Sequence, residues 1–208
     1  RMLDLRFNTV PDFLENSANL FPEKTALKFE NKEYSYREIK NKANHVSLFI
    51  LKKTKKQDIV AILLSNSPEF IFTYFGILGA GRIVLLLSPN ISDENLAFQI
   101  NKTNPKIVIS EEKYKEKFKR TKIFEKNRLY LFSEIPYIQR DFSNKNPKED
   151  DIATIIFTSG TSSEPKGVVL RHFNVVQATN NTIEFLKWNK KDINVAISEL
   201  TTKNVLWA

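Results

Sequence analysis

Short blocks of hydrophobic residues alternate with longer amphipathic segments along most of the chain. Compact β-branched and aliphatic runs predict buried strands at residues 58–64, 83–87, 106–109 and 152–157. The segments between the first three runs have helical spacing, so strand and helix follow one another in turn. We therefore predict an α/β fold with a largely parallel β-sheet flanked by helices.

Helix boundaries are marked by capping residues and prolines. Ser35 and Glu38 have the spacing of a capping box and open a predicted helix that runs to about Lys53. Thr9 and Ser92 are predicted N-caps of two further helices. A further helix is predicted to begin at Pro68, with core residues Phe70, Phe72, Tyr74 and Phe75. A hairpin is predicted from a strand at 25–29 and a return strand that starts at Tyr34. Strands are also predicted at 168–170 and 195–197, and a helix from about Arg171 to Leu186.

The strand predicted at 152–157 leads directly into a run of small and hydroxylated residues, and a second interior strand is predicted after this run. Several backbone N–H groups of such a turn can point at one place, because no bulky side chain blocks the approach, and an anion can bind there. Lys166 adds a positive charge beside the turn. The pattern differs from the P-loop of NTPases, because the first glycine is missing and no Ser or Thr follows the lysine. The candidate phosphate-binding residues are Thr158, Ser159, Gly160, Thr161, Ser162, Ser163 and Lys166.

Composition excludes several kinds of site. The 208 residues include no cysteine, so disulfides, thiolate metal sites and cysteine nucleophiles are ruled out. The two histidines, His45 and His172, are too few for a His-rich metal site, and we expect His45 to be a packing or surface residue. The net charge of +8 suits anionic partners such as nucleotides, CoA, nucleic acid or a membrane surface.

Two segments could suggest other functions. The lysine-rich stretch 111–128 also contains four glutamates, so we expect a solvated helix followed by a loop rather than a nucleic-acid site. The apolar stretch 70–87 is interrupted by Gly79, Gly81 and Arg82, so we expect two buried elements and no transmembrane segment. No signal-peptide pattern precedes Leu20, and a cytoplasmic location is expected, with peripheral membrane contact left open.

The turn closely resembles the signature loop of the adenylate-forming (AMP-binding) enzyme superfamily, which includes acyl-CoA synthetases and peptide-synthetase adenylation domains. Residues 157–168, Phe-Thr-Ser-Gly-Thr-Ser-Ser-Glu-Pro-Lys-Gly-Val, align with that loop in register. Ser162 replaces a usual threonine and Ser163 a usual glycine. If that position needs a positive φ, Ser163 costs about 1 kcal/mol. The segments that extend the resemblance are 21–26, 34–38, 76–81, 86–89, His172 and Asn174, the last two in structural roles.

The resemblance implies a partial N-terminal domain of the adenylate-forming enzyme fold, most like that of acyl-CoA synthetases. Residues 1–150 would form a first α/β subdomain, and 151–208 would begin a second subdomain with the phosphate loop at 158–167. The implied reaction activates a carboxylate, expected to be a fatty acid, with ATP and Mg²⁺, and then transfers the acyl group to CoA. Ser159, Gly160 and Thr161 would wrap the β- and γ-phosphates, Lys166 would neutralise their charge, and Thr158 would contact Mg²⁺.

The resemblance stops after residue 197, and this leaves the activity of the 208 residues open. The family's aromatic-His-x-x-Gly segment, adenine-binding stretch, ribose-binding acid and C-terminal catalytic lysine have no counterpart here, so no complete catalytic set is present. We expect no complete ligase activity from these residues alone. The alternatives are a non-catalytic binding or scaffold remnant of such an enzyme and, from the charge alone, a basic RNA-binding module.

Overall fold

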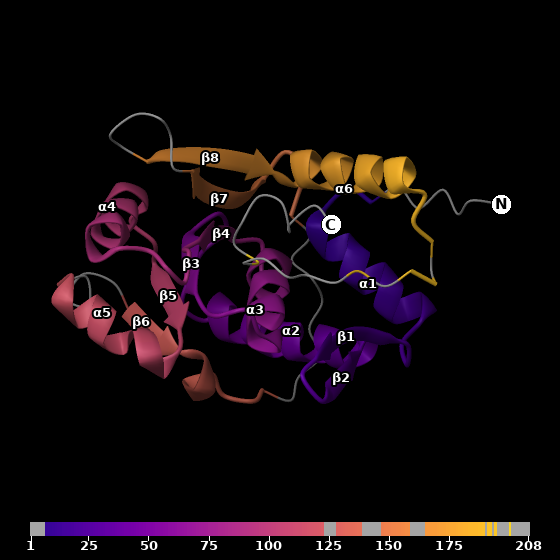
Figure 1. Cartoon of the computed structure of the whole chain (residues 1–208), viewed down its shortest axis with the longest axis horizontal. Helices are drawn as coiled ribbons and strands as arrows, with labels where there is room; N and C mark the ends of the chain where they lie inside the picture. The colour runs from indigo at the N-terminus through magenta and orange to yellow at the C-terminus, as the bar shows by residue number, and fades with distance from the viewer. Residues whose placement is uncertain are drawn as a thin grey trace.

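A six-stranded, mostly parallel sheet forms the centre of the computed structural model (Figure 1). The structure describes residues 7–122, 128–138, 147–158, 165–189, 191–192, 194 and 200. The strand order is β6-β5-β3-β4-β7-β8, and a separate two-stranded hairpin is formed by β1 and β2. The strands are β1 (Thr25–Phe29), β2 (Lys32–Ser35), β3 (Ile59–Leu63), β4 (Ile83–Leu86), β5 (Ile107–Ser110), β6 (Arg128–Leu131), β7 (Ile152–Thr158) and β8 (Lys166–Arg171).

Helices alternate with the parallel strands, as the sequence pattern predicts. All neighbouring pairs in the large sheet are parallel except β7 and β8, which are antiparallel. The α/β fold class with a largely parallel sheet is therefore confirmed. The helices are α1 (Val10–Leu20), α2 (Tyr36–Leu51), α3 (Pro68–Gly79), α4 (Asp93–Thr103), α5 (Lys115–Arg120) and α6 (His172–Leu186), with short 3₁₀ turns at Glu112–Tyr114 and Phe132–Glu134.

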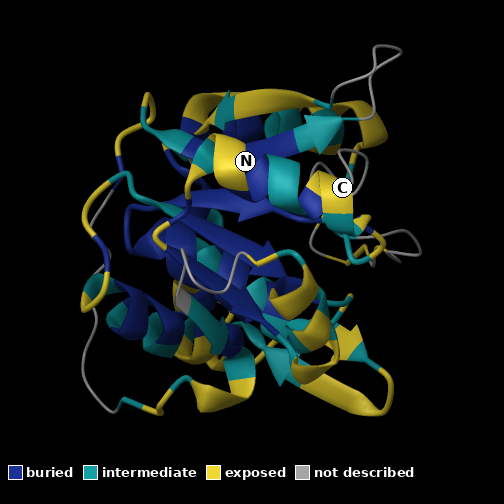
Figure 2. Ribbon diagram, turned by 90° about the vertical axis from the view of Figure 1, so that its left-hand side faces the viewer, coloured by how far each residue is buried: buried dark blue, intermediate teal, exposed yellow. Residues whose placement is uncertain are grey.

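The sheet carries a hydrophobic core on each face, because successive side chains of a strand point to opposite sides. Val60 and Ile62 of β3 join the core that contains residues of α2 and α3. Ala61 and Leu63 join the other core, with Leu96 of α4 and Phe118 of α5. The strands are therefore buried on both faces, which explains their continuous apolar sequences. Figure 2 shows the buried central strands surrounded by more exposed elements.

Helix starts follow the predicted caps closely. The Ser35 side chain accepts a hydrogen bond from the Glu38 N–H at 3.2 Å, and the Glu38 carboxylate accepts one from the Ser35 N–H at 2.7 Å. Ser92 accepts from the Asn95 N–H at 3.2 Å at the start of α4. These bonds satisfy N–H groups that the first turn of a helix leaves unpaired.

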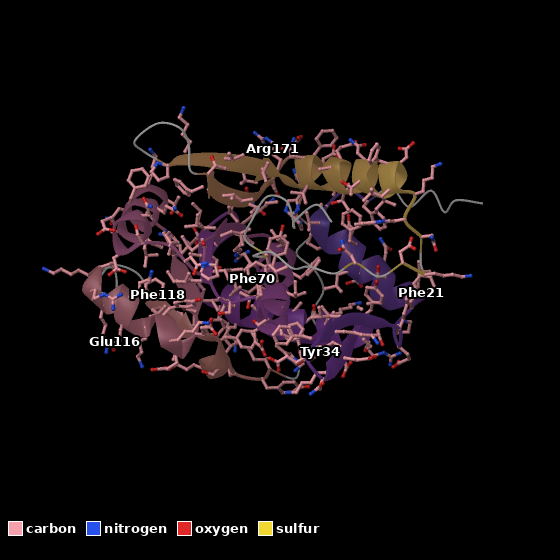
Figure 3. The ribbon with its side chains drawn as sticks, viewed as in Figure 1. Phe21, Tyr34, Phe70, Glu116, Phe118 and Arg171 are labelled. Atoms are coloured by element: carbon pink, nitrogen blue, oxygen red, sulfur yellow. The ribbon has the colours of Figure 1, made fainter. Side chains whose placement is uncertain are left out.

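The helix predicted within the stretch 111–128 is present but short. It is α5 (Lys115–Arg120), a 3₁₀ turn precedes it, and strand β6, which the sequence did not predict, begins at Arg128. Phe118 of α5 is only 1% exposed and packs into the core beneath α4 and β5, which anchors this lysine-rich segment to the sheet (Figure 3). The scattered lysines conceal this single apolar anchor.

The prediction that the strand after the phosphate turn is interior was wrong. β8 lies at the end of the described sheet order, and Val168 and Val169 are 42% and 52% exposed. An apolar run alone does not distinguish an inner strand from an edge strand. The predicted strand at 195–197 lies outside the described residues. The division of the chain into two subdomains near residue 150 stays a prediction. Strand β7, which lies after residue 150, pairs with β4 in the large sheet.

Candidate functional site

The two ends of the predicted phosphate turn face each other across an antiparallel strand pair. Thr158 is the last residue of β7, Lys166 is the first residue of β8, and the two are direct partners in the register. Opposed residues in such a pair have Cα atoms about 4.5–5.5 Å apart and side chains on the same face. The structure therefore brings Thr158 and Lys166 together, while the other predicted residues, 159–163, lie outside the described residues.

Strand β7 is held in place by a buried hydroxyl pair. Thr154 is fully buried, and its Oγ1 lies 3.2 Å from the phenolic oxygen of Tyr74 in α3. Burial raises the pKa of Tyr74 to about 12, although its hydrogen bond with Thr154 acts in the opposite direction. The phenol therefore stays neutral and links β7 to α3, four residues before the turn.

Gly167 has a packing reason to be a glycine. It lies opposite Phe157 in the register, and a Cβ at this position would be 3.3 Å from the Phe157 ring. The Phe157 ring also contacts Phe98 of α4 in an edge-on arrangement, with centroids 6.1 Å apart. Gly167 thus lets β8 pass close to the Phe157 ring, which also packs against Phe98.

The other end of the β7–β8 hairpin is tied to the segment that precedes it. The His172 N–H donates to the Asp151 carbonyl at 3.1 Å, and the Phe173 N–H donates to the Glu149 carbonyl at 2.9 Å. The Arg171 guanidinium donates to the Asp150 carbonyl, at the junction of β8 and α6 visible in Figure 3. The hairpin is therefore fixed at its base, which limits the positions that its turn can take.

His172 and Asn174 make structural contacts, as the sequence analysis expects. His172 is fully buried, and its Nδ1 accepts a hydrogen bond from the Val10 N–H at the start of α1, at 3.2 Å. The Asn174 side-chain oxygen accepts from the Arg171 N–H at 2.9 Å. Burial lowers the pKa of His172 to about 4, although the charges of Asp151 and Asp12 act to raise it. The imidazole is therefore neutral at pH 7 and joins α6 to α1.

This buried histidine predicts a loss of stability in acid. An unfolded histidine takes up a proton below its ordinary pKa of 6.5, whereas His172 stays neutral in the folded state until about 4. Unfolding is therefore favoured as the pH falls through that window, and the contribution amounts to about 3 kcal/mol. Urea titrations at pH 7 and pH 4 measure this difference.

His172→Gln is the matched control, because its amide oxygen can accept the Val10 N–H but does not titrate. The fall in the free energy of unfolding from pH 7 to pH 4 should be about 3 kcal/mol larger in the wild type than in this variant. Equal falls in the two proteins would contradict the assignment of a neutral buried imidazole.

Polar residues that the sequence analysis did not single out lie at the same edge of the sheet as the turn. β3, β4, β5 and β7 are parallel neighbours, so their carboxyl ends share one edge, where ligands bind in open α/β sheets. Glu111 follows β5, and its carboxylate accepts hydrogen bonds from the Ser65 N–H at 2.8 Å and the Ser65 hydroxyl at 2.5 Å. Burial acts to raise the pKa of Glu111, but Ser65 and Lys113 hold it below its ordinary value. Glu111 directly follows β5 and Ser65 lies two residues after β3, and a polar residue just beyond a buried strand is the signal that could have found them.

Other expected features can be placed more briefly. The half-buried His45 ring contacts the Tyr137 ring, with centroids 4.0 Å apart, which confirms a packing role. Within the described ranges, no group of three or more His, Asp or Glu side chains is arranged to hold a metal ion. None of the helices in those ranges combines the length and the apolar character that crossing a bilayer requires.

Comparison with known proteins decides the family. The family model of the AMP-binding enzymes matches residues 14–201. The chain belongs to the AMP-binding enzyme family. It is 32% identical to bacitracin synthase 2 of Bacillus licheniformis over 169 residues, which covers 81% of this chain and 6% of that protein. It is 27% identical to a long-chain-fatty-acid–CoA ligase of Bacillus subtilis over 217 residues, which covers 85% of this chain and 39% of that protein.

A solved member of the family shares the fold. The o-succinylbenzoate–CoA synthetase of Bacillus subtilis, in complex with ATP and magnesium ion, superposes with a TM-score of 0.84 at 20% identity. The superposition covers 94% of this chain and 52% of that synthetase. The adenylate-forming fold expected from the turn motif is confirmed, and the chain corresponds to the N-terminal region of such enzymes. It spans about half of the solved synthetase and less of the two relatives in sequence.

Proposed function

We propose that the turn between β7 and β8 holds the β- and γ-phosphates of ATP and so contributes to carboxylate activation by an adenylate-forming enzyme. The proposal is supported above all by the register that sets Lys166 opposite Thr158. This pairing closes the ends of a turn whose sequence, Thr-Ser-Gly-Thr-Ser-Ser-Glu-Pro-Lys-Gly, carries the family signature. Closed ends let the backbone N–H groups and the ammonium group converge on one anion.

The residues of this chain have distinct proposed roles. Backbone N–H groups and hydroxyls of Ser159, Gly160 and Thr161 donate hydrogen bonds to phosphate oxygens, with Ser162 and Ser163 completing the turn. Lys166 is exposed and can reach the same oxygens as a point charge. Such groups would stabilise the negative charge that develops on the pyrophosphate leaving group when a carboxylate oxygen attacks the α-phosphorus.

A magnesium ion fits this site only as a partner of the nucleotide. Mg²⁺ usually binds through one or two carboxylates together with substrate phosphates. The described residues contain no cluster of three acidic or histidine ligands, and Thr158 offers a single hydroxyl at the end of β7. We infer that the phosphates provide most ligands of the ion and that Thr158 provides one contact. When bound, the ion would neutralise phosphate charge.

The complete reaction requires more of an adenylate-forming domain than these residues provide. We propose that the full enzyme converts a carboxylate and ATP into an acyl-adenylate and pyrophosphate, and that CoA then takes the acyl group as a thioester. A fatty acid is the proposed carboxylate, because one matched relative is a long-chain-fatty-acid–CoA ligase. The cytoplasm is the proposed setting, where ATP and CoA are both supplied.

A titration with three ligands tests the phosphate site in the 208-residue chain. Calorimetry with Mg·ATP and with Mg·tripolyphosphate should give saturable heats, because both carry the phosphate tail that the turn binds. Adenosine should give none, because it lacks the tail. Binding of adenosine but not of tripolyphosphate would contradict the proposal. No pyrophosphate release is expected from this chain with ATP and a fatty acid.

A non-catalytic binding or scaffold role is the second candidate. Ser163 favours it, because it occupies the place of a usual family glycine and can strain the turn. This candidate predicts no saturable heat with either Mg·ATP or Mg·tripolyphosphate. The same titration therefore separates the two candidates.

A further inference from the structure

Gln57 holds a backbone conformation that residues with a side chain rarely adopt. It lies in the loop between α2 and β3 with a φ of 60°, in the left-handed region that favours glycine. Its N–H donates to the Gly81 carbonyl at 3.0 Å, which fixes the loop against the turn after α3. Backbone strain of this kind persists only where the surrounding contacts hold it in place, and the side chain of Gln57 makes such contacts.

The Gln57 amide binds both backbone polar groups of Ile152, the first residue of β7. Its Nε2 donates to the Ile152 carbonyl at 3.3 Å, and its Oε1 accepts from the Ile152 N–H at 3.0 Å. The side chain thus pairs with β7 as the backbone of a neighbouring strand would. Lys56 supports the same contact, because its ammonium group lies 2.9 Å from the Asp151 carboxylate.

A β-bulge follows Ile152 directly. Ile152 is opposite Arg171 of β8 in the register. Thr154 is opposite Leu170, so Ala153 is one extra residue in β7. A bulge interrupts the backbone hydrogen bonds of a strand pair, and unpaired backbone groups are costly where water is partly excluded. The glutamine amide supplies partners for the backbone at the point where the interruption begins.

The extra residue in β7 decides which side chain lies opposite Lys166. Counted from the pair at the base of the hairpin, strands without the bulge would place Lys166 opposite Phe157, whereas the structure places it opposite Thr158. Opposed residues share a face of the sheet, so loss of the bulge would move the ammonium group to the other face of β7. The base of the hairpin is held by the hydrogen bonds described above, and the turn lies at its other end (Figure 1). A slip in register would therefore displace the turn.

We propose that Gln57 is a positioning residue of the phosphate turn, because it stabilises the bulge in β7 and so the register that sets Lys166 opposite Thr158. Gln57 binds the first residue of β7 and the turn follows the last, so Gln57 acts through the strand. The effect on nucleotide binding rests on the proposed function. The register itself can be observed without a nucleotide.

Two substitutions of Gln57 test this role. Gln57→Gly removes the amide but adopts a positive φ without strain, so the chain should still fold. Gln57→Glu can accept the Ile152 N–H, but its carboxylate cannot donate to the Ile152 carbonyl. In calorimetry, both variants should bind Mg·ATP about threefold or more weakly than the wild type, because part of the population holds Lys166 out of place. Gln177→Glu, in the exposed part of α6, is the matched control for the added charge and should bind as the wild type does.

Nuclear magnetic resonance reports the register through Gly167, which a general loss of stability would not change. Gly167 lies so close to the Phe157 ring that a Cβ would be 3.3 Å from it, and the ring current shifts resonances of atoms held there. Without nucleotide, the Gly167 resonances of both Gln57 variants should move or double. Saturating Mg·ATP should return them to the wild-type positions, because a ligand selects the conformation that binds it. Gln177→Glu should give the wild-type spectrum throughout.

Two results would overturn the positioning role while leaving the proposed function intact. One is a wild-type Gly167 spectrum in both Gln57 variants without nucleotide. The other is a changed spectrum with a dissociation constant for Mg·ATP equal to that of the wild type. Failure of the proposed function is a separate result, because the wild type itself would then bind no Mg·ATP, and it would overturn the positioning role as well.

Discussion

Replacing Gly76 with alanine is expected to lower the free energy of unfolding by about 2–4 kcal/mol. Gly76 lies where α3 crosses α2, and a Cβ there would be 2.6 Å from the Val46 Cβ and 2.8 Å from the Ala43 carbonyl oxygen. The Ser47 hydroxyl also donates to the Gly76 carbonyl at 2.7 Å across the same crossing. The helices must therefore separate, and this cost exceeds the gain of about 1 kcal/mol in helix propensity. Urea unfolding monitored by circular dichroism measures the change.

Asn101→Ala in the exposed part of α4 is the control for Gly76→Ala, because it also introduces alanine into a helix. It should change the free energy of unfolding by no more than about 0.5 kcal/mol. A Gly76→Ala protein as stable as the wild type would show that α2 and α3 do not cross as closely as the structure places them.

Removing the Arg82 guanidinium is expected to cost about 3 kcal/mol or more of stability. Arg82 is only 5% exposed, and its Nε donates to the Thr54 hydroxyl at 2.8 Å, while Nη2 donates to the Thr54 carbonyl at 2.6 Å. Nη1 donates to the Ala80 carbonyl. Burial lowers the pKa of Arg82, although the charge of Asp58 acts to raise it. The side chain ties the end of α2 to the turn after α3.

Arg82→Leu keeps the aliphatic volume but removes all three hydrogen bonds. The carbonyl oxygens of Thr54 and Ala80 then lose the guanidinium as their donor. Arg82→Lys keeps the charge with fewer donors, and its loss of stability should be smaller than that of Arg82→Leu. Urea unfolding of both variants measures the order. A loss of less than about 1 kcal/mol for Arg82→Leu would contradict the role of Arg82 as a buried link.

The alternation of apolar runs and amphipathic segments was enough to predict most of the fold. Capping residues such as Ser35 and Ser92 marked helix starts, because their side chains satisfy free N–H groups in the first turn. Strand β6 was missed because a long polar segment precedes it and only its pairing with β5 makes it a strand. The roles of Gly76 and Arg82 depend on neighbours brought together by folding, which no local pattern contains.

The two ends of the phosphate turn were predictable from the sequence, but the contacts around the turn were not. The motif itself named Thr158 and Lys166, and their pairing follows from two strands joined by a turn. The hydrogen bond between the Tyr74 and Thr154 hydroxyls joins residues eighty positions apart in the sequence, so it could not be inferred from spacing. The exposure of Val169 could not be inferred either, because the place of β8 in the strand order decides it.

The most direct test of the account is the dissociation constant of Mg·ATP for the wild-type chain and for Lys166→Ala, measured by calorimetry at low ionic strength. Lys32→Ala, in the β1–β2 hairpin, serves as the control for the loss of one exposed lysine. The account predicts that Lys166→Ala weakens binding by about tenfold or more, because a charge-assisted contact with phosphate is lost, while Lys32→Ala binds as the wild type does. Equal dissociation constants for the wild type and Lys166→Ala would contradict it.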